Sequence, residues 1–185
     1  MTRANEQFYM PTPAPDHQWV ILHNPADYES LVDPAHRSGK GPLIAHTSSA
    51  GGDGVAHYAD FPWLGSWALV LRPRALTVLR NCLADATLIP LSLDGDQAHV
   101  LCPAEIDAVD EHRSVIRRIP GSPDIIYFLR LALDPSRVGD ADVFRLPHRG
   151  SGTYVSQRFV DAVGNGGLVG LLFDPVGGPE LRLVR

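Results

Sequence analysis

Cysteine is scarce in this sequence: Cys82 and Cys102 are the only two among 185 residues. They do not form a Cys-x-x-Cys pair, and two cysteines are too few for a disulfide framework. We therefore expect both to be free thiols, buried in the core of a protein from a reducing compartment.

Long hydrophobic runs and concentrated basic charge are also missing. No stretch approaches the roughly 20 apolar residues of a membrane-spanning helix, and the N-terminal MTRANEQFYMPTPAPD lacks the apolar run of a signal peptide. The 16 Lys and Arg residues are outnumbered by 21 Asp and Glu, which gives a net charge of −5. Proteins that grip phosphate backbones normally carry a basic stripe. We therefore expect a cytoplasmic location, no membrane partner and no nucleic-acid partner.

The composition that is present is that of an ordinary globular protein, with 44% hydrophobic and 20% charged residues. The 17 Gly and 16 Pro residues indicate many turns and a loop-rich N-terminal third. Residues 1–16 contain Pro11, Pro13 and Pro15, and we expect them to be extended or disordered. Residues 17–185 are then expected to form a single domain.

Two main helices are predicted. Pro73 suits the first helical turn, and Leu76, Leu79 and Leu83 follow at spacings that place them on one apolar stripe. The second helix is expected to begin after Ser156 as N-cap, carry Phe159, Val160 and Val163, and end at Gly164. One or two further helical turns are expected within residues 26–32.

A β-hairpin is predicted over residues 89–102, because alternating apolar residues flank the turn sequence Asp94-Gly95. Pro90 cannot donate a ladder hydrogen bond, so it must lie on an edge strand or face a free side. Other strands are expected at residues 19–22, 67–71, 114–119, 125–133, 142–146, 168–173 and 181–184, with a short buried helix as the alternative for 125–133. Residues 34–54 are expected to be a loop with room for a short strand at 43–45. The predicted fold class is α+β with a mostly antiparallel sheet.

The first candidate site is a glycine-rich segment, residues 48–54, flanked by His46 and His57. A phosphate-binding loop aims backbone N–H groups and a helix N-terminus at the phosphate. Here no useful helix follows Gly54 and the Lys-Ser/Thr pair of a Walker loop is absent, so a flexible loop is favoured. His46 and His57 could converge across it, yet no pattern supplies a third metal ligand. We predict no metal, no cofactor and no catalytic residue.

The densest group of titratable residues is an acidic cluster, Glu105, Asp107, Asp110 and Glu111, followed by His112. Paired carboxylates can carry out acid–base chemistry when burial separates their pKa values. A solvated turn after the hairpin explains the cluster equally well. The third interpretation is an acidic patch that faces a protein partner.

Residues 73–176 resemble a bacterial family of immunity proteins of polymorphic toxin systems, first catalogued as a domain of unknown function. Four segments carry the resemblance, in this order: Leu88-Ile89-Pro90-Leu91; Glu105 to Glu111 before Ser114; Asp142-Val143-Phe144-Arg145-Leu146; and Tyr154 to Phe159 leading into Gly167 to Val176. The last is the most specific, with a valine–serine helix start, a glycine break and a Gly-Leu-x-Gly-x-x-Phe strand. The N-terminal third has no counterpart.

The resemblance implies a protein that binds a cognate toxin in the producing cell and blocks it without being an enzyme. Under that hypothesis we predict that Glu105, Asp107 and Glu111 contact the toxin. Two alternatives remain: a small hydrolase or transferase that uses the His46–His57 loop and the acidic turn at 105–111, and a binding module for an unrelated partner. The sequence does not indicate which toxin is bound or the oligomeric state.

Overall fold

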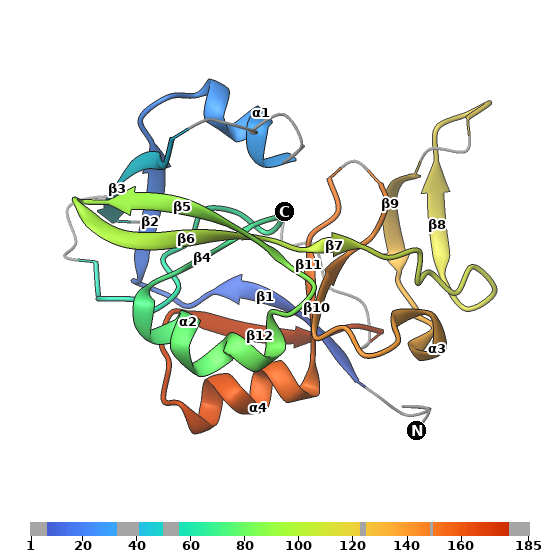
Figure 1. Ribbon diagram of the computed structural model, residues 1–185. Helices are drawn as coiled ribbons and strands as arrows, with labels where there is room; N and C mark the ends of the chain where they lie inside the picture. The colour runs from blue at the N-terminus through green and yellow to red at the C-terminus, as the bar shows by residue number, and fades with distance from the viewer. Residues whose placement is uncertain (1–6, 33–40, 50–55, 123–124, 149, 178–185) are drawn as a thin grey trace.

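The computed structural model describes residues 7–32, 41–49, 56–122, 125–148 and 150–177. Their strands form two five-stranded sheets and one two-stranded sheet (Figure 1). The first sheet, in spatial order, contains β12 (Leu171–Pro175), β1 (Phe8–Pro13), β11 (Thr153–Ser156), β10 (Val143–Arg145) and β7 (Ala104–Glu105). The second contains β2 (Gln18–Leu22), β3 (Leu43–Ser49), β5 (Thr87–Leu93), β6 (Asp96–Cys102) and β4 (Leu69–Leu71). The third pairs β8 (Val115–Arg118) with β9 (Ile125–Arg130).

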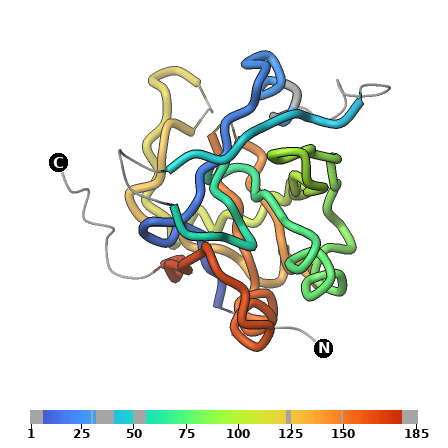
Figure 2. Tube along the Cα trace, turned by 90° about the vertical axis from the view of Figure 1, so that its left-hand side faces the viewer, coloured from blue at the N-terminus to red at the C-terminus, as the bar shows by residue number. Residues whose placement is uncertain are grey.

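The predicted mixture of helices and sheet is present, but the described chain is richer in strands than expected. Among the strands of the described residues, the β3–β5 and β7–β10 pairs are parallel and the other pairs are antiparallel. The helices are α1 (Ala26–Val32), α2 (Pro73–Leu79), α3 (Pro135–Val138) and α4 (Gln157–Asn165), and a 3-10 turn (Arg80–Cys82) extends α2. Figures 1 and 2 show α1 and α4 at opposite ends of the molecule. Among the helices described, none is long and apolar enough to cross a membrane.

The two predicted main helices, α2 and α4, pack on one hydrophobic core. Leu79 is fully buried there, together with Phe159 and Val163 from α4. As predicted, Ser156 caps α4, and its hydroxyl accepts a hydrogen bond from the backbone N–H of Phe159 at 3.2 Å. The helix continues past Gly164 to Asn165. A Cβ atom at Gly166 would lie 2.8 Å from Cγ1 of Val78, so glycine is needed at that position for α4 to approach α2.

The predicted hairpin is β5–β6, and its turn residues Asp94 and Gly95 have φ angles of 54° and 87°. The Asp94 carboxylate also accepts hydrogen bonds from the backbone N–H and the hydroxyl of Thr47, at 3.0 and 2.8 Å. This pair of bonds joins the turn to β3. Strand β5 is not at the sheet edge, but β3 pairs with it only from Leu91 onward, which leaves Pro90 outside that ladder.

Several segments expected to be loops or ambiguous are strands. Residues 43–49 form the seven-residue β3 in place of a short strand in a loop, and residues 8–13 form β1 between β11 and β12. Residues 125–130 are the strand β9, so the alternative of a buried helix is wrong. The strand expected at 181–184 lies outside the described residues. The described chain therefore uses its N-terminal residues as part of the first sheet.

Two further hydrophobic cores complete the molecule. One lies beneath α1 and contains Leu31 with the inward side chains of β2, β3, β5 and β6. The other contains Phe8, Phe144 and Tyr154, and the ribbon β8–β9 packs on it through Ile116 and Phe128. The predicted burial of both cysteines is confirmed: Cys82 and Cys102 are buried and are not in a disulfide.

Candidate partner-binding surface

The acidic turn comprises residues 105–111, between β7 and the start of β8. Glu105 ends β7, and the parallel pairing of β7 with β10 places it opposite Arg145. The two side chains form an ion pair at 2.7 Å, in which the Glu105 side chain is about half exposed. The Arg145 contact fixes the position of the Glu105 carboxylate and partly neutralises its charge.

Asp110 organises the turn itself. Its carboxylate Oδ1 accepts hydrogen bonds from the backbone N–H groups of His112 and Arg113, at 3.1 and 3.2 Å. Its own backbone N–H donates to the carbonyl of Ala132 at 2.9 Å, which anchors the turn to the segment after β9. Asp107 is exposed, whereas Ala108 next to it is fully buried. The acidic side chains therefore stand on a fixed turn.

Glu111 completes the predicted set. Its carboxylate lies 2.8 Å from Nη2 of Arg118 on β8, and the Glu111 side chain is largely exposed. An exposed pair of this kind contributes only about 0–1 kcal/mol to stability. Both Glu105 and Glu111 thus form ion pairs with arginines of their own chain. The surface at the turn therefore carries acidic and basic side chains next to each other.

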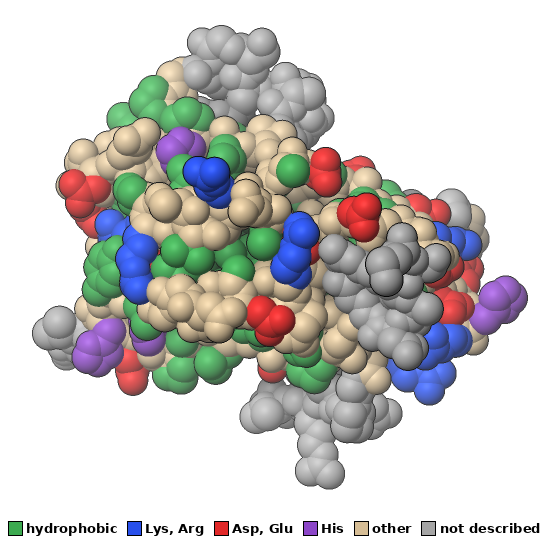
Figure 3. Space-filling model, turned by 60° about the horizontal axis from the view of Figure 1, so that its bottom comes forward, with side chains coloured by type: hydrophobic (Ala, Val, Ile, Leu, Met, Phe, Trp, Pro, Cys, Tyr) green, Lys and Arg blue, Asp and Glu red, His purple; other side chains and the backbone are tan. Residues whose placement is uncertain are grey.

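The ribbon β8–β9 follows the turn and exposes much apolar surface. Figure 1 shows it at one end of the molecule, next to α3. Ile116 and Phe128 face the core, so side chains that alternate with them point outward. The exposed large apolar side chains of the ribbon and its ends are Val115, Ile119, Ile126, Tyr127 and Leu129. Figure 3 shows acidic, basic and histidine side chains gathered at the same end of the molecule.

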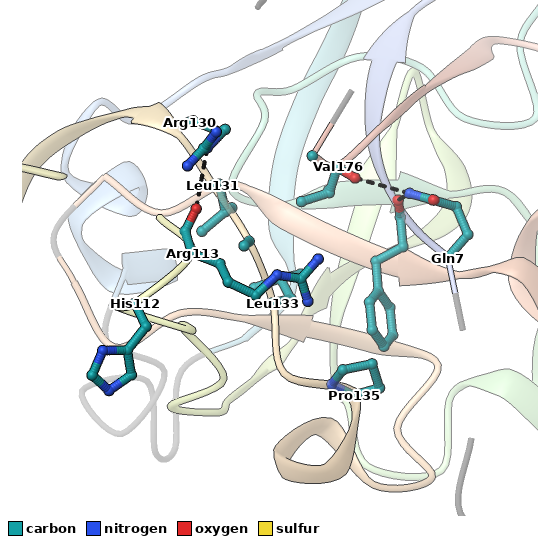
Figure 4. A pocket seen from close by; sticks show the side chains of 11 residues that line it. Gln7, His112, Arg113, Arg130, Leu131, Leu133, Pro135 and Val176 are labelled. Carbon is teal, nitrogen blue, oxygen red and sulfur yellow. Dashed lines mark hydrogen bonds between the residues drawn. The ribbon is translucent and has the colours of Figure 1, made fainter. Parts of the chain in front are cut away.

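A pocket of about 750 Å³ opens between this end and β1 (Figure 4). Its lining comprises Gln7, Phe8, His112, Arg113, Arg130, Leu131, Ala132, Leu133, Pro135, Val176 and Gly177. Figure 4 shows the Arg113 side chain reaching into the pocket, while the ring of His112 points away from it. Nε of Arg130 donates a hydrogen bond to the carbonyl of Arg113 at 3.1 Å. Sequence reasoning missed this pocket, because its residues come from four separate segments.

His46 and His57 do not form a common site. His46 pairs with Ile21 on β2, whereas His57 forms a bridge with His17, which precedes β2. Four residues of extended chain separate these positions, or about 13 Å. In Figure 1, β3 and the acidic turn lie toward opposite ends of the molecule. The residues of the hydrolase or transferase hypothesis are therefore not assembled, and the described residues contain no cluster of metal-ligand type.

A second group of titratable residues is centred on the buried Asp142 and is structural. The Asp142 carboxylate accepts a hydrogen bond from the Ser156 hydroxyl at 2.5 Å and forms an ion pair with Arg158. Arg158 also donates to the carbonyl of Asn81 at 3.2 Å. Burial, with a smaller contribution from Asp142, raises the pKa of the adjacent Cys82 thiol. A thiol with a raised pKa is mostly protonated at neutral pH and reacts poorly as a nucleophile, so Cys82 does not suggest covalent chemistry. The contacts of Asp142 and Arg158 hold the start of α4 in place.

A fixed turn with charged side chains, next to exposed apolar side chains on the ribbon, has the features of a protein-recognition surface. Residues 103–178 match the model of an immunity protein family (Imm11). The predicted resemblance to an immunity-protein family is thereby confirmed for this region. The match includes the acidic turn, the ribbon and most of the pocket lining. No curated protein matches the chain.

Proposed function

We propose that the protein confers immunity to a bacterial toxin by binding the cognate toxin directly in the cytoplasm and blocking its active site or substrate groove. The match of residues 103–178 to an immunity protein family supports this role. The protein would act stoichiometrically, with the toxin as its protein partner and with no cofactor.

The acidic turn is our candidate for the centre of the contact, with the predicted residues Glu105, Asp107 and Glu111. The main observation behind this choice is that Asp110 and its backbone hydrogen bonds hold the turn in one conformation. A turn that is already ordered loses little conformational freedom on binding. The neighbouring ribbon supplies exposed apolar and aromatic side chains, which contribute most to affinity when a partner buries them.

Reversing two charges of the turn, Asp107→Lys with Glu111→Lys, is expected to weaken toxin binding by about tenfold or more. The reason is that each close charge pair across an interface contributes about 1.5 kcal/mol or more to the binding free energy. Glu105 is left intact because its ion pair with Arg145 joins β7 to β10. The measurement is the affinity for the toxin domain encoded beside the gene, at low and moderate salt, together with rescue of growth on co-expression.

The matched control is Asp85→Lys with Asp96→Lys, which makes the same change in net charge at two exposed positions outside the turn. It should bind as the parent does once salt screens long-range attraction. A folded turn variant that binds as tightly as the parent at both salts would exclude the acidic turn from the contact. Failure of the parent itself to bind or rescue would contradict the proposed function.

A further inference from the structure

The 750 Å³ pocket beside the acidic turn differs from the rest of the surface in charge. The chain carries a net charge of −5, yet no acidic residue is among the described residues that line the pocket. Arg113 and Arg130 both contribute to its wall. The pocket is thus a local concentration of positive charge in a protein that is acidic overall.

The Arg113 guanidinium is available to bind a ligand in the pocket. Among the described residues its ion-pair contact is with Asp110, at 4.0 Å from Nε, and the Arg113 side chain is about three-quarters exposed. The Asp110 carboxylate is already engaged by two backbone N–H groups through its other oxygen, Oδ1. A guanidinium presents five N–H donors in a planar fork that fits a carboxylate. Arg113 therefore retains donors that can bind an incoming anion.

Arg130 is held in place for the same task. The bond from its Nε to the carbonyl of Arg113 fixes the guanidinium at the pocket wall (Figure 4). The lining also includes the apolar residues Phe8, Leu131 and Pro135, although polar atoms make up most of the exposed wall. A guest with a short aliphatic stem and a carboxylate at its end would contact both kinds of surface. Aspartate and glutamate side chains have this shape.

We infer that the pocket binds an acidic side chain of the partner protein, which Arg113 and Arg130 hold by charge-assisted hydrogen bonds. This inference rests on the proposed function for the identity of the partner. The pocket adjoins the acidic turn, since His112 and Arg113 directly follow Glu111. The partner would have to present a carboxylate next to basic residues, and such alternation of charge excludes proteins with a uniformly basic surface.

The first test needs no toxin. The full chain, labelled with ¹⁵N, is titrated with a blocked hexaglutamate peptide, and the Nε–H signals of Arg113 and Arg130 are followed by NMR. Saturable shifts are expected at these two signals, with none from a hexaglutamine peptide. Arg113→Gln should weaken hexaglutamate binding by at least tenfold, whereas Arg113→Lys, which keeps the charge but loses the planar fork, should have an intermediate affinity. Arg80→Gln, the same change at an exposed arginine of the 3-10 turn, should leave the affinity within twofold of the parent.

The outcomes separate this inference from the proposed function. Equal loss in Arg113→Gln and Arg80→Gln, or shifts spread over all arginines, would mean nonspecific charge attraction and overturn the inference. Inorganic phosphate that shifts the same signals at lower concentration would overturn the assignment to a carboxylate. If hexaglutamate binds as expected, Arg113→Gln should also weaken binding of the toxin at least tenfold. A toxin that binds the parent and Arg113→Gln equally would contradict the pocket's role and leave the proposed function standing.

Discussion

Replacing Leu79 by Ala is expected to lower the free energy of unfolding by about 2–5 kcal/mol, the range for cavity-forming changes in a packed core. Leu79 is fully buried between α2, α4 and the sheets, in the largest of the three hydrophobic cores. Packing around it is fixed on both sides, because α4 meets α2 where Gly166 allows the close approach to Val78. The surrounding chain therefore has little freedom to fill the cavity.

The measurement is chemical denaturation followed by circular dichroism. The control is Thr77→Ala on the same helix, where the side chain is exposed and the expected change is about 0.5 kcal/mol or less. A midpoint for Leu79→Ala that equals the parent's within error would show that this face of α2 does not carry the core.

The parts of the fold that sequence analysis predicted are those specified by neighbouring residues. The hairpin β5–β6 needs only alternating apolar residues and a turn that accepts positive φ, and Asp94-Gly95 supplies it. Likewise α4 begins where Ser156 can cap Phe159. These signals act over a few residues, so the sequence alone reveals them.

Strand β1 shows why other elements were missed. Pro11 and Pro13 argue against a strand, because proline cannot donate a ladder hydrogen bond. In the structure, β11 pairs with β1 only at Phe8 and Tyr9, so both prolines have β12 as their one paired neighbour. The side of β1 that faces away from β12 needs no ladder hydrogen bond at these two positions, so proline is tolerated there. Only the arrangement of distant strands reveals this.

The candidate partner-binding surface also has one part that the sequence predicts and another that only the structure reveals. The acidic turn is continuous in sequence, and its composition made Glu105, Asp107 and Glu111 candidates at once. Their arginine partners come from β8 and β10, and the pocket brings together residues near 7, 112, 130 and 176. No local pattern links segments so far apart. The alternation of acidic and basic side chains on this surface is therefore visible only in the folded structure.

The second large effect is expected from Asp142→Ala, which should destabilise the protein by about 2–3 kcal/mol, since hydrogen bonds to a buried charged group are worth about 1.5–3 kcal/mol. The buried Asp142 carboxylate accepts from the hydroxyl of Ser156 and from Arg158. Its removal leaves the buried Ser156 hydroxyl without that acceptor. The Arg158 contribution is reduced by solvent, because its side chain is about half exposed.

The Asp142 network also links α4 to the 3-10 turn after α2, through the bond from Arg158 to the carbonyl of Asn81. Asp142→Asn should cost less than Asp142→Ala because an acceptor oxygen remains. Asp161→Ala, which removes an exposed carboxylate from the same helix, should change stability by about 0.5 kcal/mol or less. These comparisons are made by denaturant unfolding of the three variants.

Measurements of toxin binding distinguish the structural role of Asp142 from a role in the proposed interface. Asp142 is buried at the start of α4, and it belongs neither to the acidic turn nor to the residues that line the pocket. Under conditions where Asp142→Ala remains folded, its toxin affinity should therefore equal the parent's, while the variants of the turn and of Arg113 bind weakly at full stability. A folded Asp142→Ala that loses binding as strongly as those variants would mean that the contact surface extends to α4.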